Sequence, residues 1–159
     1  MRMDKLTNQL QTALADAQSL ALGKDHNFIE PVHLLSALLE QRGGACKPLL
    51  QKAGADIAGL AQRTKAAIEA LPTVSGTGGD IHMSNDLGKI LNVTDKLAQK
   101  SGDTYISSEL VLLAMLESKT KAGELLQASG VKALELKGAI EMMRGGEAVD
   151  KPEAEESRQ

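Results

Sequence analysis

Aromatic side chains are almost absent from this sequence. Its 159 residues include no tryptophan, one phenylalanine (Phe28) and one tyrosine (Tyr105). A hydrophobic core therefore has to be built from leucine, alanine, isoleucine, valine and methionine, which suit close packing between helices. The same shortage leaves the lysines without an aromatic platform of the kind that accompanies nucleic-acid binding.

Cysteines and long apolar runs are also scarce. Cys46 is the only cysteine, which excludes an internal disulfide. No apolar run approaches the ~18 residues of a membrane span, and the first residues show no apolar stretch of a signal peptide. The net charge is −3, with acidic and basic residues mixed along the chain, which disfavours a nucleic-acid partner. We expect a cytoplasmic protein that binds neither nucleic acid nor membranes.

The sequence contains an internal repeat. Residues 7–41 align without a gap on residues 84–118, and the alignment resumes after a one-residue slip. Apolar positions recur throughout, and polar identities such as Asn8 over Asn85 and Glu40 over Glu117 recur with them. A duplicated unit explains this pattern economically, because a fixed period of similarity marks a repeated structural element.

Each copy has the pattern of four helices, because apolar residues recur at spacings of three and four between glycine and proline breaks. The expected helices are 6–22, 31–40, 48–53 and 56–71 in the first copy, and 84–100, 108–118, 121–129 and 131–143 in the second. Ser84 and Ser107 are candidate N-cap residues. The sequence thus predicts an all-α domain, 1–143, of two tandem pseudo-symmetric four-helix repeats.

The predicted boundaries place repeat one at 4–71, a connector at 72–83 and repeat two at 84–143. Residues 144–159 change in character, because charged residues, two glycines and a proline replace the large apolar side chains. Such composition is typical of a linker or a frayed tail.

Sites for catalysis or metals are not apparent. The stretch Gly76-Thr77-Gly78-Gly79 is followed by Asp80 and Ile81, whereas a phosphate-binding loop requires lysine and then serine or threonine. The three histidines, His26, His33 and His82, lack the spacing of a zinc site and are interpreted as solvated or helix-start residues. Cys46 is interpreted as a small buried hydrophobe. We expect no metal, no cofactor and no enzymatic activity in this chain.

The two copies differ where a common fold gives no reason for a difference. Asp16 is replaced by Val93, and His33 is replaced by Leu110. Val93 joins Ile90 and Leu97 in an apolar strip beside the core-facing positions of the helix at 84–100. Two interpretations are open: the strip packs against the other repeat, or it forms a shallow apolar groove with Asp103 and Glu109 as an acidic rim.

Several strings resemble a known family. The segments at 28–39 and 105–110, and the strings ALADAQSLAL at 13–22 and DKLAQK at 95–100, are similar to the paired repeats of the Clp amino-terminal domain of Hsp100 disaggregases. The resemblance implies a mobile module of a hexameric ATPase that works with the DnaK chaperone system, with 144–159 leading toward ATPase modules outside this chain. It also implies client-contacting residues: a polar set of Thr7, Ser84, Asp103 and Glu109, and a groove of Val93, Leu97 and Leu110.

Three functions compete on this basis. The first is a client-binding module, which contacts unfolded or aggregated polypeptides weakly and with broad sequence tolerance. The second is a docking platform for one adaptor protein. The third is a steric gate above an ATPase ring, in which case the apolar strip is buried between the repeats. The fragment is expected to be a monomer.

Overall fold

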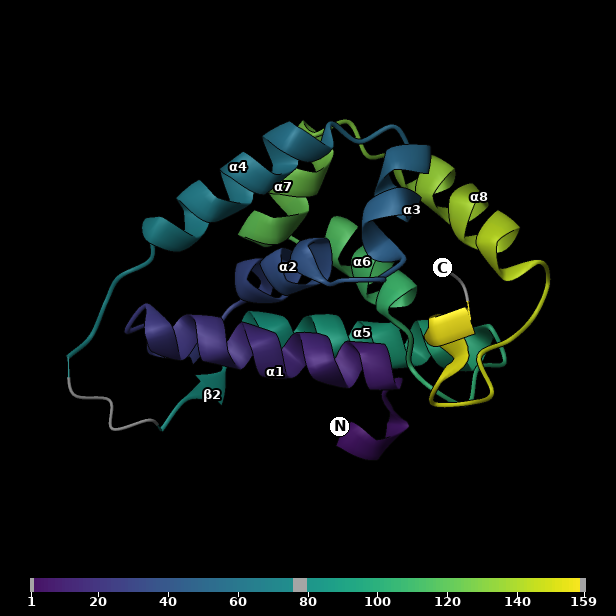
Figure 1. Ribbon diagram of the computed structural model, residues 1–159, viewed down its shortest axis with the longest axis horizontal. Coiled ribbons are helices and arrows are strands. Elements are labelled where there is room, and N and C mark those ends of the chain that lie inside the picture. Colours follow the sequence, from purple (N-terminus) through teal and green to yellow (C-terminus); the bar gives the residue numbers. More distant parts are fainter. Residues whose placement is uncertain (1, 76–79, 158–159) are drawn as a thin grey trace.

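The computed structural model describes residues 2–75 and 80–157, and Figure 1 shows a helical domain. The repeat-one helices are α1 (Asn8–Gly23), α2 (Pro31–Glu40), α3 (Cys46–Lys52) and α4 (Ile57–Glu69); those of repeat two are α5 (Asn85–Lys100), α6 (Ser108–Leu116), α7 (Lys121–Ala128) and α8 (Ala133–Arg144). Two-residue strands, β1 (Phe28–Ile29) and β2 (His82–Met83), and two 3-10 turns, η1 (Met3–Lys5) and η2 (Ala154–Ser157), complete it. The predicted all-α class and double four-helix repeat are confirmed.

The residues just before the first helix of each repeat form backbone contacts with the other repeat. Ile29 pairs with Met83 in the parallel β1–β2 ladder, and Leu6 forms the equivalent parallel bridge with Ile106. At the start of α1 the Thr7 amide donates to the Ile106 carbonyl at 3.0 Å, and at the start of α5 the Ser84 amide donates to the Ile29 carbonyl at 3.0 Å. The two first helices are therefore positioned by backbone bonds that cross between the repeats.

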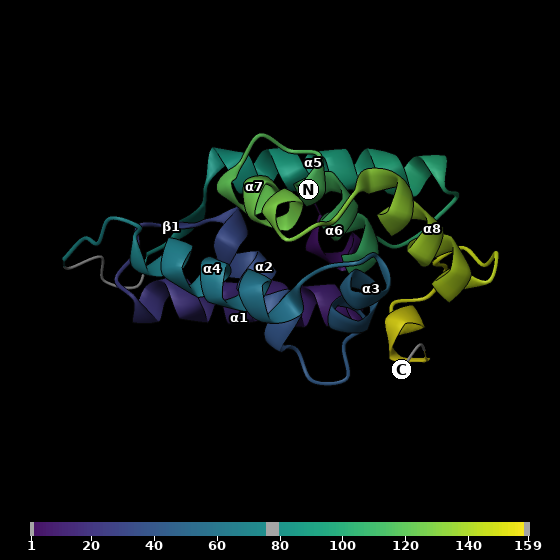
Figure 2. The ribbon, with the colours of Figure 1, turned by 90° about the horizontal axis from the view of Figure 1, so that it is seen from above.

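The later helices interlock in the same way. Helix α3 packs against α8, and α4 packs against α7, so the third helix of each repeat meets the fourth helix of the other. Seen from above, α1 and α5 lie along opposite edges with α2 and α6 between them (Figure 2). The apolar residues of both repeats form one continuous core. The domain is thus one folding unit rather than two lobes.

Two glycines meet where the repeats cross. Gly54 follows α3 with φ +90°, and Gly130 follows α7 with φ +92°. A Cβ atom on Gly130 would lie 3.4 Å from the Gly54 carbonyl oxygen. Positive φ and close backbone approach both favour glycine, so these positions allow the two α3–α4 and α7–α8 turns to touch.

Connector residues on both sides of 76–79 contact repeat one. Thr73 bridges His26 in antiparallel fashion, the Val74 amide donates to the Asp25 carbonyl at 2.8 Å, and His82 belongs to β2. The Gly76–Gly79 stretch, whose sequence does not fit a phosphate-binding loop, lies outside the described residues.

The segment after Arg144 differs from the linker or frayed tail that its composition suggested. Residues 145–157, hereafter the C-terminal strap, fold back onto repeat two and end in η2 beside α1 (Figure 1). Val149 is fully buried and Glu155 is 4% exposed. A charged segment packs here because its few buried groups find specific partners, which composition alone does not reveal.

Alanine at the glycine crossing should destabilise the domain. Gly54→Ala and Gly130→Ala are each expected to lower the free energy of unfolding by about 1–2 kcal/mol, because a left-handed backbone penalises a Cβ atom. Gly138→Ala is the matched control, since Gly138 lies inside α8 with open space around it. This control should gain about 0.5–1 kcal/mol. Urea unfolding measures all three, and equal effects at the three sites would contradict the role of the crossing.

Candidate functional site

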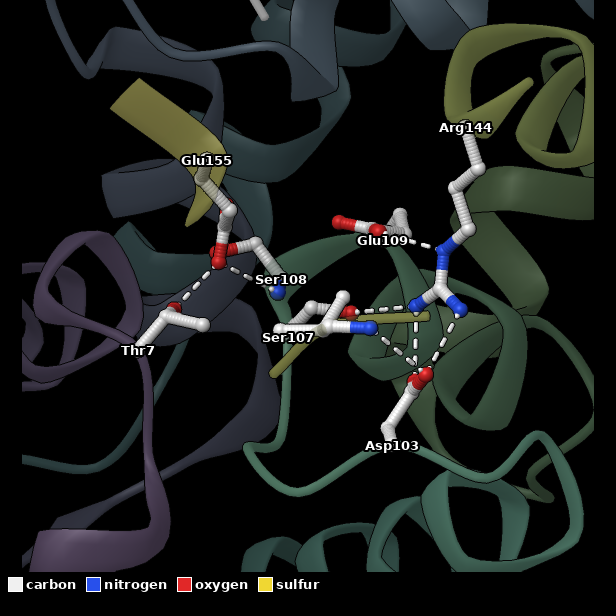
Figure 3. A network of polar contacts seen from close by, with 8 residues as sticks. Thr7, Asp103, Ser107, Ser108, Glu109, Arg144 and Glu155 are labelled. Carbon is white, nitrogen blue, oxygen red and sulfur yellow. Dashed lines mark hydrogen bonds and ion pairs between the residues drawn. The ribbon is translucent and has the colours of Figure 1, made fainter. Parts of the chain in front are cut away.

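Arg144, in the last turn of α8, organises the polar residues of repeat two. Its guanidinium donates to both carboxylate oxygens of Asp103, at 3.1 and 2.9 Å, to Glu109 Oε2 at 2.9 Å and to the Ser107 hydroxyl at 3.0 Å. Figure 3 shows these three residues converging on the guanidinium. Ser107 stands at the N-cap position of α6 but makes no side-chain cap bond, because its hydroxyl turns toward Arg144.

The network is almost closed to solvent. The Arg144 side chain is 8% exposed, that of Asp103 is 0% and that of Glu109 is 2%. Burial opposes the charge of Arg144, but Glu109 and Asp103 outweigh it and hold the pKa of the guanidinium above its ordinary value. Buried carboxylates of this kind depend on their cation and hydrogen bonds, since an unpaired charge is costly in a low-dielectric interior.

A third buried carboxylate lies beside this network (Figure 3). Glu155 of the C-terminal strap accepts hydrogen bonds from the Thr7 hydroxyl and from the Ser108 amide, the latter at 3.0 Å. Burial, followed by the charge of Glu109, raises the pKa of the Glu155 carboxyl, and the bonds from Thr7 and Ser108 act in the opposite direction.

The structure separates the seven residues that the resemblance groups as a client site. Thr7 is fully buried as the N-cap of α1, Ser84 is half-buried as the N-cap of α5, and each hydroxyl accepts a helix amide. Asp103 and Glu109 are covered and both form ion pairs with Arg144, so they form no exposed acidic rim.

The three predicted groove residues differ in exposure. Leu110 is 4% exposed and belongs to the core, because the fully buried helix α6 leaves no free face at this position. Leu97 is half-buried against the core, and Val93 is 47% exposed. Of the two open interpretations, packing therefore describes Leu110 and an exposed apolar surface describes Val93.

A shallow apolar hollow lies next to Val93. It has a volume of about 270 Å³ and lies between α5 and the stretch from the end of α6 to the start of α7. Ile90, Val93 and Ala114 provide its apolar lining. The charged and polar lining residues are Asp86, Lys89, Glu117, Ser118, Lys119 and Thr120. The rim of this hollow is thus mixed in charge rather than acidic.

His26 and His33 form a buried pair, so neither is solvated, whereas the expected position at a helix start holds for His33 in the first turn of α2. His33 Nδ1 accepts from the Glu30 amide at 2.8 Å, and its Nε2 lies 2.9 Å from His26 Nδ1. Since the first bond makes Nδ1 an acceptor, Nε2 carries the proton and donates it to His26. Burial and, to a smaller extent, His26 lower the pKa of His33 to about 4.

Cys46 is 3% exposed, and burial raises the pKa of its thiol, which matches the expected small buried hydrophobe. His82 is exposed beside Asp80. Within residues 2–75 and 80–157 no three histidine, cysteine or acidic side chains gather in a group that could hold a metal ion. Across the same residues, no helix is long and apolar enough to cross a membrane.

Removing the guanidinium should be costly. Arg144→Met is expected to lower the free energy of unfolding by about 3–5 kcal/mol, because Asp103 and Glu109 would remain buried without their cation. Arg2→Met is the control, since Arg2 forms an exposed pair with Asp4 and its loss should leave stability unchanged. Thermal and urea unfolding of both variants test this, and a small loss for Arg144→Met would show that the network is not stabilising.

Stability should also fall in mild acid through His33. Between pH 6.5 and about 4 the unfolded chain takes up a proton at this side chain and the folded chain does not, so the folded state loses up to on the order of 3 kcal/mol as pH decreases. His33→Leu, which introduces the residue found at the equivalent position of repeat two, should flatten this part of the pH profile. Exposed His82→Leu should retain the wild-type slope in urea unfolding at pH 7, 6 and 4.5; equal slopes for all three proteins would refute the assignment.

Known proteins are similar to this chain in sequence and in fold. Residues 5–129 match the family described as the Clp repeat (R) N-terminal domain. Chaperone protein ClpB of Pseudomonas putida is 54% identical over 159 residues, which are 100% of this chain and 19% of that protein. The Hsp104 N-terminal domain of Candida albicans has a TM-score of 0.84 at 20% identity, covering 95% of this chain and 99% of its own.

A ClpV N-domain solved in complex with a VipB peptide has a TM-score of 0.72 at 22% identity, covering 91% of this chain and 90% of its own. The expectation that no ATPase region lies in these residues is confirmed, because they match an N-terminal domain and span 19% of the length of the ClpB relative. Over most of its length, in sequence and in fold, the chain therefore belongs to the Clp repeat N-terminal domain family.

Proposed function

We propose that this domain captures exposed apolar segments of unfolded or aggregated proteins for an ATP-dependent disaggregase. In the whole protein it would act as the N-terminal module of a hexameric Clp ATPase that cooperates with the DnaK system. The domain itself requires no cofactor for this role, because shape and apolar contact are sufficient to hold a disordered segment.

The observation that carries the proposal is the exposure of Val93. A valine 47% exposed beside a hollow floored by Ile90 and Ala114 offers apolar area to a partner. The equivalent residue of repeat one is Asp16, so the shared fold does not require an apolar side chain here. Charges of both signs around the hollow suit varied client sequences, since neither sign is strongly repelled.

The relatives support a binding role. The ClpB relative is a chaperone by name, and the ClpV N-domain of similar fold is in complex with a peptide. The latter also keeps docking of one adaptor peptide as the second candidate. The steric-gate alternative expects the apolar strip to be buried between the repeats, which does not fit the exposure of Val93.

Val93→Asp should weaken client binding. This substitution introduces the residue that repeat one has at the equivalent position. We expect the affinity for a permanently unfolded protein, such as reduced and carboxymethylated α-lactalbumin, to fall about tenfold, because roughly half of a valine side chain no longer becomes buried on binding. Fluorescence anisotropy measures the affinity, and amide shifts in an NMR titration identify the surface.

Asn92→Asp is the matched control, because Asn92 is the exposed neighbour on α5 and the change adds the same charge without removing the valine. It should bind the client as wild type does. Leu110 is unsuitable as a probe, since a polar residue there would damage the core. Unchanged affinity in a folded Val93→Asp protein would exclude the hollow as the client site, and tight binding of one folded protein would favour the adaptor role.

A further inference from the structure

The C-terminal strap lies on the domain as a bound peptide would: residues 147–150 run without turns, and residues 151–157 then turn into η2. The Thr104 and Tyr105 amides donate to the Val149 carbonyl at 2.7 and 3.1 Å, and the Val149 amide donates to Asp103 Oδ1 at 2.9 Å. Farther along, the Asn8 amide donates to the Pro152 carbonyl at 2.8 Å. Main-chain bonds of this kind recognise a peptide backbone whatever its side chains.

Two side chains anchor the strap. Val149 is fully buried and Glu155, six residues later, is 4% exposed, whereas Asp150, Lys151 and Glu153 between them are exposed. The Glu155 carboxylate meets the Thr7 hydroxyl and the amide of Ser108, the first residue of α6. A helix N-terminus and a hydroxyl together favour a carboxylate.

The strap is joined to α8 by a glycine pair that allows it to detach. Gly145 and Gly146 follow α8 with φ of +59° and +86°, both are exposed, and a Cβ on either would meet open space. Arg144 precedes this pair of glycines and can therefore stay with Asp103 and Glu109 when the strap swings away. Burial and, after it, the nearby Glu109 charge raise the pKa of Glu155 and so oppose its ionised form, which offsets part of the binding energy of the strap.

We propose that the surface formed by residues 7–8 and 103–108 is a peptide-binding site, and that the C-terminal strap is its tethered ligand. The site accepts a segment with an aliphatic residue in an open stretch and, six positions toward the C-terminus, a glutamate in a following turn. It is distinct from the client hollow, because none of the residues that line the hollow takes part. A tethered ligand competes at an effective concentration on the order of millimolar, so the site opens to other peptides only when the strap is displaced.

The test uses the full chain and a fluorescent peptide with the sequence of residues 147–157. Val149→Asp should release the strap, because it brings a buried carboxylate next to Asp103. Ala148→Asp is the matched control, since Ala148 is exposed and the same charge is introduced one residue away. We expect Val149→Asp to bind the peptide at least tenfold more tightly than wild type or Ala148→Asp does. Replacing Glu155 by alanine in the peptide should reduce this binding about tenfold.

Hydrogen exchange in the wild-type chain gives an independent measurement that requires no variant to fold. The Asn8, Thr104 and Tyr105 amides are bonded to the strap, whereas those of Thr7 and Ile106 are bonded across the two repeats. The first three should exchange together and at least tenfold faster than the other two, because local opening releases only the strap.

Adding Val93→Asp should not alter peptide binding, which separates this site from the client hollow. A folded Val149→Asp chain that fails to bind the peptide, or that binds the alanine peptide equally well, would overturn the proposal. Equal exchange of the Thr104 and Ile106 amides would overturn it as well, since the strap would then be an integral part of the fold.

Discussion

The backbone bonds that cross between the repeats are the constraint on which the rest of the structure depends. Thr7 caps α1 while its amide is held by Ile106, and Ser84 caps α5 while its amide is held by Ile29. The start of each first helix is therefore fixed by the second helix region of the other repeat. This arrangement requires both copies to keep the same core. A residue that differs between the repeats without changing the core therefore indicates a role other than folding.

Two such departures produce the two surfaces proposed to bind polypeptides. On α5, Val93 replaces Asp16 and converts a charged position into an apolar one beside a hollow. In both repeats the chain after the fourth helix returns to the segment that follows the first helix. The Val74 amide donates to the Asp25 carbonyl in repeat one, and the Val149 carbonyl accepts from the Thr104 and Tyr105 amides in repeat two. In repeat two this returning segment also carries Glu155, whose buried carboxylate accepts hydrogen bonds from Thr7 and Ser108. Both repeats thus share the contact between these segments, and in repeat two the strap continues it as far as η2.

Sequence reasoning recovered the helices because the repeat gave each apolar pattern twice. It also singled out Val93, since the charged residue at the matching position indicates that the shared core does not require an apolar side chain there, although packing against the other repeat stayed open. It misplaced Leu110, because a leucine on the wholly apolar helix α6 has no pattern that separates core from surface. Arg144 and Glu155 were missed for another reason: their partners lie 41 and 148 residues away, at Asp103 and Thr7. A lone valine, Val149, in a charged segment was the one local sign that this segment packs.

The buried pairing of Arg144 changes how the acidic residues can act. A basic client segment that sought Asp103 and Glu109 would have to displace a guanidinium already held by hydrogen bonds to both carboxylates and to Ser107. Such an exchange gains little, because one charge-assisted contact replaces another at the same buried site. In the proposed function, client affinity would therefore come from apolar area at the Val93 hollow, where the charged rim is mixed and exposed. A small, shallow apolar contact without fixed charge partners favours weak binding and broad sequence tolerance, which are the properties required to recognise proteins by their unfolded state rather than by their sequence.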